Sequence, residues 1–243
     1  MEALRENFAA ARELSAGATR AELAKMNAPL TIQYFSDVLC VWAWIAELRN
    51  QELEATWQQQ VVIVPHFLDL FADTKARVGQ GWAERGGYDG FAQHVRQAAE
   101  PYDSPVHSDV WSKVRPATSA NAHLIIKAAQ IVAGDAAASA LARAIRSAFF
   151  AQAMDVGSLD VLEGIARDSG LDLAPLEVCL KNGEAIAALL SDAALKTAGR
   201  VVGSPTWILN EGRQTLYGNV GYRVLHANVE ELLRRPSHEA SWC

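Results

Sequence analysis

The stretch that decides the fold is Ser36–Trp44, with the sequence SDVLCVWAW. It follows an apolar, β-like run at residues 30–35 and opens an apolar helix. Cys40 therefore lies between the end of a strand and the N-terminus of a helix. The unpaired backbone N–H groups at a helix N-terminus carry partial positive charge. A thiol in this position is expected to lose its proton more readily, and the thiolate is the reactive form. The pattern predicts that Cys40 is a nucleophile.

The predicted site contains one thiol rather than two. Ala43 stands three residues after Cys40, at the spacing where a Cys-x-x-Cys motif has its second cysteine. The chain has 3 cysteines in all, which is not the dense, even set of a disulfide framework. Cys179 lies in an apolar run and is predicted to pack in the core, whereas Cys243 could act on Cys40 only if the C-terminal tail folds back. We therefore expect a free, reactive thiol in a reducing compartment.

Composition excludes several classes of function. Hydrophobic residues make up 50% of the 243 residues and charged residues 21%, which is typical of a globular protein. The net charge of -6 provides no basic surface for nucleic acid or for an anionic membrane. No apolar run approaches a membrane span, and the N-terminus does not resemble a secretory signal. The expected location is the cytoplasm.

The hydrophobic pattern predicts two strands first, at 30–36 and 61–68, with a helix at 40–57 between them. A glycine-rich, irregular segment at 72–90 follows, which we interpret as an exposed loop or lid. The predicted helices after it span 91–100, 117–133, 135–153, 158–169, 173–182 and 184–199. The chain ends with a hairpin of strands 206–209 and 214–217 around a turn at 210–212, and with a helix at 222–234.

This order, β-α-β, a helical block and then β-β-α, predicts an α/β protein with a thioredoxin-like fold and an inserted all-helical domain. The thioredoxin-like domain would comprise residues 28–71 and 200–243, and the helical insertion residues 72–199. Residues 1–27 are predicted to form a helical extension that packs on the body or on a second subunit.

Two separated motifs resemble the DsbA-like branch of the thioredoxin superfamily. One is the strand, Asp37-x-x-Cys40 and helix; the other is Asp192 followed by Gly199–Thr206 (GRVVGSPT). The similarity spans about residues 30–235 and is greatest to FrnE-type proteins, kappa-class glutathione transferases and 2-hydroxychromene-2-carboxylate isomerases. The resemblance implies a cis peptide bond at Pro205, beside Cys40, with Ser204 offering its backbone to an extended, peptide-like ligand such as glutathione.

The departures from that family define the functional alternatives. FrnE-type proteins have Cys-Pro-Trp-Cys where this chain has Cys40 to Ala43, and the glutathione enzymes have serine at the position of Cys40. The leading hypothesis is a glutathione-linked, monothiol thiol–disulfide oxidoreductase acting on a small thiol or disulfide. The first alternative is a glutathione-dependent transferase or cis–trans isomerase of the kappa or chromene type. The second is a non-catalytic thiol- or peptide-binding scaffold. The resemblance also makes a homodimer plausible.

Several further residues are candidates for the site. The resemblance places Asn219 near the region where kappa-type relatives hold the γ-glutamyl end of glutathione, although Arg223 comes later than expected. Asp37 would raise the pKa of Cys40, and its preferred role is to accept hydrogen bonds from backbone donors at the helix start. The histidines lack zinc-ligand spacing, so no metal is expected. Aromatic residues could line a substrate cleft; Trp42 is the preferred candidate and Trp44 is expected in the core, and the others are Trp82, Tyr88 and Trp111.

Overall fold

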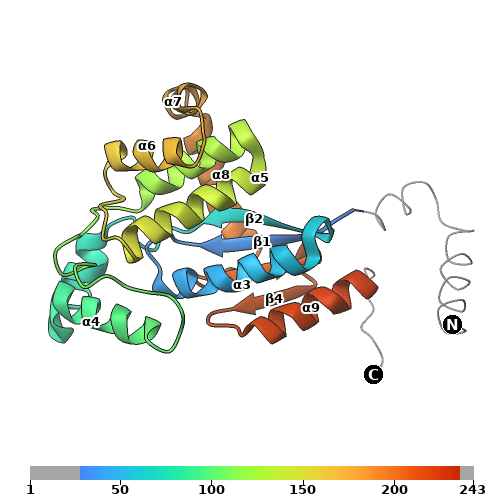
Figure 1. Cartoon of the computed structure of the whole chain (residues 1–243), viewed down its shortest axis with the longest axis horizontal. Helices are drawn as coiled ribbons and strands as arrows, with labels where there is room; N and C mark the ends of the chain where they lie inside the picture. Colours follow the sequence, from blue (N-terminus) through green and yellow to red (C-terminus); the bar gives the residue numbers. More distant parts are fainter. Residues whose placement is uncertain (1–27, 236–243) are drawn as a thin grey trace, which may run out of the picture.

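The computed structural model describes residues 28–235, so the predicted extension at 1–27 and Cys243 lie outside the described residues. A four-stranded sheet with the order β2-β1-β3-β4 forms its centre (Figure 1). β1 runs parallel to β2 and antiparallel to β3, and β3 runs antiparallel to β4. The strands are β1 (Leu30–Ser36), β2 (Val61–Phe67), β3 (Thr206–Leu209) and β4 (Gln214–Tyr217).

Alternation along β1 assigns the two faces of the sheet. Ile32 and Tyr34 belong to an apolar cluster with residues of α3 (Val41–Trp57) and α9 (Tyr222–Arg234), and both helices lie in front of the sheet in Figure 1. Phe35 faces the other way and stacks on His66 of β2, with ring centroids 4.8 Å apart. Side chains of a strand alternate between its faces, so a helix packed against His66 covers the face opposite to α3 and α9.

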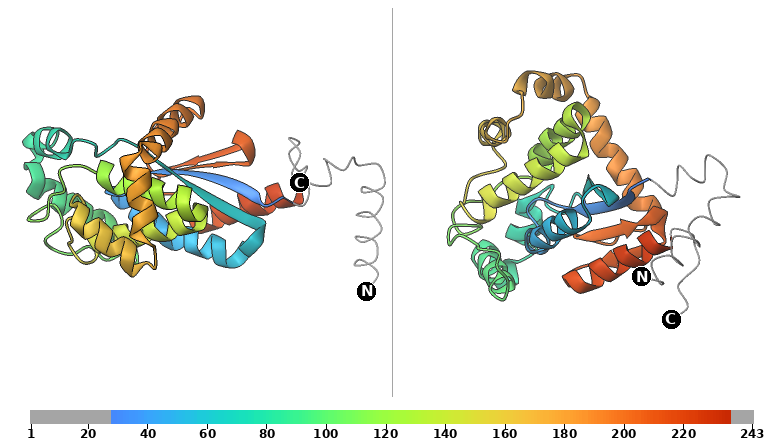
Figure 2. Two further views of the ribbon diagram at one scale, coloured as in Figure 1. Left: turned by 90° about the horizontal axis from the view of Figure 1, so that it is seen from above. Right: turned by 45° about the vertical axis from the view of Figure 1, so that its right-hand side comes forward.

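The remaining helices come between β2 and β3, as the sequence predicts. α8 and the long helix α5 both contact β2, and α5 also contacts α6 and α7 (Figure 2). The hydrophobic clusters of the insertion and of the α3 N-terminus are continuous, so the two parts share one core. These helices are α4 (Gly87–Ala99), α5 (Ala120–Phe150), α6 (Leu159–Asp168), α7 (Leu173–Lys181) and α8 (Glu184–Ala198).

α5 combines the two helices predicted at 117–133 and 135–153. The predicted break is present within it, because Gly134 has φ 86 and is not helical. By length and composition alone α5 could cross a membrane, a test that the core helix of a globular protein also passes. In this structure it packs against α6, α7, α8 and β2 and contains the buried side chains of Lys127 and Arg146.

The segment predicted as an irregular loop at 72–90 is mostly built of short helical turns. A π-helical turn, η2, spans Lys75–Gln80, and a 3-10 turn, η3, spans Ala83–Arg85. α4 begins at Gly87 rather than at residue 91. The glycines therefore permit tight turns here rather than an extended loop.

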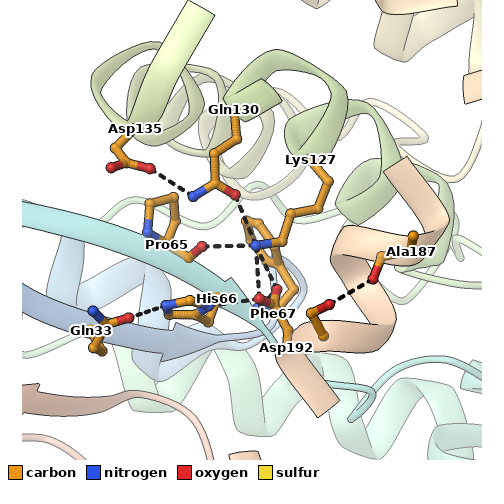
Figure 3. Close-up of polar contacts among 10 residues, drawn as sticks. Gln33, Pro65, His66, Phe67, Lys127, Gln130, Asp135, Ala187 and Asp192 are labelled. Atoms are coloured by element: carbon orange, nitrogen blue, oxygen red, sulfur yellow. Dashed lines mark hydrogen bonds and ion pairs between the residues drawn. The ribbon is translucent and has the colours of Figure 1, made fainter. Parts of the chain in front are cut away.

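A buried polar cluster fixes α8 to the sheet (Figure 3). Asp192 of α8 accepts hydrogen bonds from the backbone N–H of Phe67 at 2.8 Å and from the Lys127 ammonium at 2.8 Å. It also contacts His66 Nδ1 at 2.6 Å, and the other ring nitrogen of His66 contacts Gln33. Asp192 and Lys127 are each under 5% exposed, at 2% and 3%. The cluster joins β1, β2, α5 and α8, and so positions the segment that runs from α8 into β3.

We predict that Asp192→Ala destabilises the fold by about 3–5 kcal/mol, because it leaves the buried Lys127 ammonium without its counter-charge. Chemical denaturation by urea measures the change. Asp168→Ala, at an exposed position of α6, is the control and should change the unfolding free energy little. Equal stability of the two variants would contradict a stabilising role for Asp192.

Candidate active site

Cys40 is the N-cap residue of α3, at the end of a tight turn that leaves β1. Its backbone N–H donates to the Asp37 carbonyl at 3.1 Å, and its own carbonyl accepts from the N–H groups of Ala43 and Trp44 at 3.1 and 3.0 Å. The residue is 7% exposed. The turn therefore fixes the Cys40 backbone at the first turn of the helix, where the sequence places it.

The loop before β3 meets this turn directly. The Ser204–Pro205 peptide bond is cis. The Cys40 thiol donates to the Ser204 carbonyl at 3.5 Å, and the Asp37 N–H donates to Ser204 Oγ at 3.1 Å. Two segments separated by 164 positions in the sequence thus lie in contact at the sulfur.

Asp37 is fully buried and connects the turn to the helical insertion. Its carboxylate accepts from the N–H of Leu39 at 2.9 Å, from the N–H of Phe71 at 3.0 Å and from the Ser119 hydroxyl at 2.9 Å. The predicted role of Asp37 as an acceptor for backbone donors is therefore confirmed. Burial raises its pKa to about 6, although these three hydrogen bonds favour the charged form.

His123 of α5 contacts the same turn without carrying charge. Its Nε2 accepts from the Val38 N–H at 3.3 Å, and burial lowers its pKa to about 3. The imidazole is therefore neutral at pH 7. Its distance of 3.7 Å from the Asp37 carboxylate is consequently no ion pair, because only a protonated ring would make one.

The thiol is less acidic than its position at a helix start predicts. Burial raises the pKa of Cys40, and the nearby Asp37 carboxylate raises it further. The Ser204 side chain and the backbone groups of Trp42 and Ala43 lower the pKa. The expectation that the helix N-terminus gives a readily ionised thiol was wrong, because the loss of hydration outweighs the helix-terminal N–H groups.

A cavity of about 480 Å³ opens beside Cys40, between the sheet domain and the front of the insertion. Trp42 and Ser204, both predicted for the site, line it together with the thiol. Leu70 and Phe71 provide one part of its wall, and Gly203 and Tyr217 another. The part contributed by residues 77–94 is formed by Arg77, Gly81, Trp82, Arg85, Phe91 and His94.

Other predicted residues lie elsewhere. Asn219 is not among the residues that line the cavity; its side chain contacts Arg49 at 2.7 Å and the Tyr102 hydroxyl. Trp44 is partly buried and stacks on Phe150, in line with the expected core role. Trp111 is fully buried, so its placement in a cleft was wrong.

Tyr88 packs against the Trp111 ring rather than lining the cavity, whereas Trp82 does line it. Cys179 is 5% exposed within α7, which confirms its predicted core position. Ser119, His123 and the two cavity arginines were not predicted from the sequence. The first two follow no recognisable motif, and the arginines stand in a segment that the sequence presents only as glycine-rich.

Comparison with known proteins agrees with this geometry. The family model of the DSBA-like thioredoxin domain matches residues 31–230. No curated protein sequence matches the chain.

Two solved structures illustrate the shared fold. The cytosolic disulfide reductase DsbM from Pseudomonas aeruginosa, with GSH, is 19% identical and has a TM-score of 0.64, covering 84% of this chain and 100% of its own. A 2-hydroxychromene-2-carboxylate isomerase is 19% identical with a TM-score of 0.61, covering 85% of this chain and 97% of its own. At these identities the likeness establishes the fold.

We predict that Cys40 reacts slowly with iodoacetamide at pH 7 and that its rate rises through the alkaline range, because its pKa is raised and only the thiolate reacts. Asp37→Asn removes the neighbouring negative charge and should shift the midpoint to lower pH. The measurement uses a background of Cys179→Ala and Cys243→Ser, and Asp168→Asn is the matched control. A wild-type midpoint below the ordinary thiol value of about 8.5 would contradict this prediction.

Proposed function

Because the chain belongs to the DSBA-like thioredoxin domain family, we propose that it is a thiol–disulfide oxidoreductase that works through the single thiol of Cys40, with glutathione as co-substrate. The observation that carries the proposal is a thiol that lines an open cavity and contacts the Ser204 carbonyl before a cis proline. The position three residues later is the buried Ala43, and within residues 28–235 no second thiol stands at this site.

The single thiol dictates a two-step exchange. The Cys40 thiolate attacks the glutathionyl sulfur of a mixed disulfide, RSSG; a Cys40–glutathione disulfide forms, and the R–S thiolate leaves and takes up a proton. The thiolate of a free glutathione then attacks the glutathione sulfur of that intermediate. Oxidised glutathione leaves and the Cys40 thiolate is restored. The balance is RSSG + GSH → RSH + GSSG.

Glutathione suits the groups that surround the sulfur. Ser204 lines the cavity next to a cis peptide bond, and we expect its backbone to pair there with an extended, peptide-like ligand. The backbone groups of Trp42 and Ala43 favour the charged sulfur, so they support both the attacking and the leaving thiolate. Glutathione is a small co-substrate that can supply the thiol that position 43 lacks. Ser204, Pro205 and Trp42 are the proposed binding residues, and Asn219 stays a weaker candidate outside the cavity.

One observation favours a second candidate, a glutathione-dependent transferase or isomerase. Burial raises the pKa of Cys40, so at pH 7 the residue is a neutral S–H donor. A neutral donor could stabilise the thiolate of bound glutathione, as a serine hydroxyl would. In that reaction Cys40 forms no covalent bond, and a hydroxyl at this position would preserve the rate.

We also propose that the protein works in the cytoplasm. The proposed cycle needs reduced glutathione and a free thiol, and both persist in a reducing compartment. Cys40 and Cys179 are free within residues 28–235.

We predict that Cys40→Ser abolishes the reduction of a glutathione mixed disulfide to the uncatalysed rate, because oxygen cannot replace sulfur in the covalent intermediate. The assay couples GSSG formation to a NADPH-dependent reductase. Cys179→Ala is the control and should retain the activity. Retention of most of the rate by Cys40→Ser would falsify the monothiol mechanism and favour the transferase or isomerase.

A further inference from the structure

The cavity beside Cys40 contains positive charge without a counter-charge. Arg77 and Arg85 line it, and no aspartate or glutamate is among its lining residues within 28–235. We propose that these two arginines select small disulfides whose leaving thiol carries an anionic group, such as a carboxylate. This inference rests on the proposed function and specifies the substrate class of the same site.

Neither guanidinium is engaged by a carboxylate in the described part of the chain. Two acidic side chains close in sequence have other partners: Asp73 accepts from the N–H of Ala76 at 2.9 Å, and Asp89 lies 3.6 Å from Arg115. Glu84 precedes Arg85 in η3 and forms no ion pair with it in the described residues. The hydrogen bond that Arg85 donates to the Gly81 carbonyl is long, at 3.4 Å. In a chain with a net charge of -6, two arginines without a carboxylate partner at one cavity are a specific feature of that cavity.

Aromatic rings hold both guanidinium groups in place. Arg85 lies over the Trp82 ring at 3.7 Å and Arg77 over the Phe71 ring at 4.8 Å, measured to the ring centroids. A guanidinium that lies over a ring can still donate from its N–H groups, and these match the two oxygens of a carboxylate. The ring contacts therefore support the arginine side chains without using their hydrogen-bond donors.

The backbone under Arg85 is also fixed. Gly86 has φ 89, in the left-handed region. A Cβ at Gly90 would lie 1.7 Å from the Arg85 carbonyl oxygen, so only glycine permits this close approach of α4 to η3. The position of Arg85 is thus set by the turn itself.

The same wall provides an apolar surface for the body of such a ligand. Trp82 packs against Phe91 and His94, with centroids 5.0 and 5.1 Å apart. Burial, and then the charge of Arg85, lower the pKa of His94, so this ring adds no positive charge at pH 7. A volume of about 480 Å³ holds a small molecule rather than a folded partner. The site fits a compact, partly aromatic thiol with a negative group.

The test compares two aromatic disulfides that differ in charge and need no glutathione. 5,5′-Dithiobis(2-nitrobenzoate) is anionic and 2,2′-dithiodipyridine is neutral, and each releases a coloured thiol when Cys40 attacks it. The measured quantity is the ratio of the two rate constants, which cancels any change in the pKa of Cys40. Cys179→Ala and Cys243→Ser are present throughout.

We expect Arg77→Gln and Arg85→Gln each to lower this ratio by about tenfold, the loss of one charge-assisted contact of roughly 1.4 kcal/mol. Lys75→Gln is the matched control: it removes one positive charge from the same turn but does not line the cavity, so the ratio should stay within twofold.

An unchanged ratio in both arginine variants would overturn the inference while the proposed function stands. The inference also fails if Lys75→Gln lowers the ratio equally, because the effect would then be general charge attraction. A wild-type Cys40 that reacts with neither reagent would contradict the proposed function and this inference together.

Discussion

The site depends on the buried carboxylate of Asp37. It receives hydrogen bonds from Leu39 in the thiol turn, from Phe71 at the entry to the insertion and from Ser119 before α5. Its backbone N–H donates a hydrogen bond to Ser204 Oγ in the cis-proline loop. Four segments that are distant in sequence therefore converge on one residue. A buried charge is tolerated only when its hydrogen bonds are complete, so these segments must be in place together.

This arrangement has a chemical consequence for the sulfur. A neighbouring carboxylate and the loss of water both oppose ionisation of Cys40, and the helix-terminal N–H groups only partly compensate. A thiol that is mostly protonated is protected from indiscriminate oxidation. The arginines of the same cavity wall would act on the substrate, by attracting an anionic group to the cavity that the thiol lines.

Much of the fold was predictable because its signals are local. The strand bounds of β1, β3 and β4 follow from apolar runs and turn residues, and the break in α5 follows from Gly134. The contact of Cys40 with Ser204 could be expected only from the family resemblance, since 164 positions separate them. Asp192 belonged to the quoted motif, but nothing local indicates that Lys127 and His66 are its partners.

The sequence could not predict properties that depend on burial, such as the pKa of a thiol or the exposure of an aromatic ring. The acidity of Cys40 was misjudged because its helix position is visible in the sequence and its desolvation is not. Trp111 was predicted to line a cleft because the sequence alone does not distinguish an aromatic residue that lines a cavity from one that is buried in the core.

The cavity arginines are a second feature that the sequence alone did not predict. Arg77 and Arg85 stand in a segment whose sequence predicts only turns, yet the turns of η2 and η3 bring both of them to the wall that faces Cys40. The helical insertion therefore does more than cover the sheet. The sheet domain provides the sulfur and the cis-proline loop, and the insertion provides the two arginines. Changes in the short turns at 75–86 could alter the substrate without disturbing the buried carboxylate on which the thiol depends, because specificity and chemistry lie on separate parts of the chain.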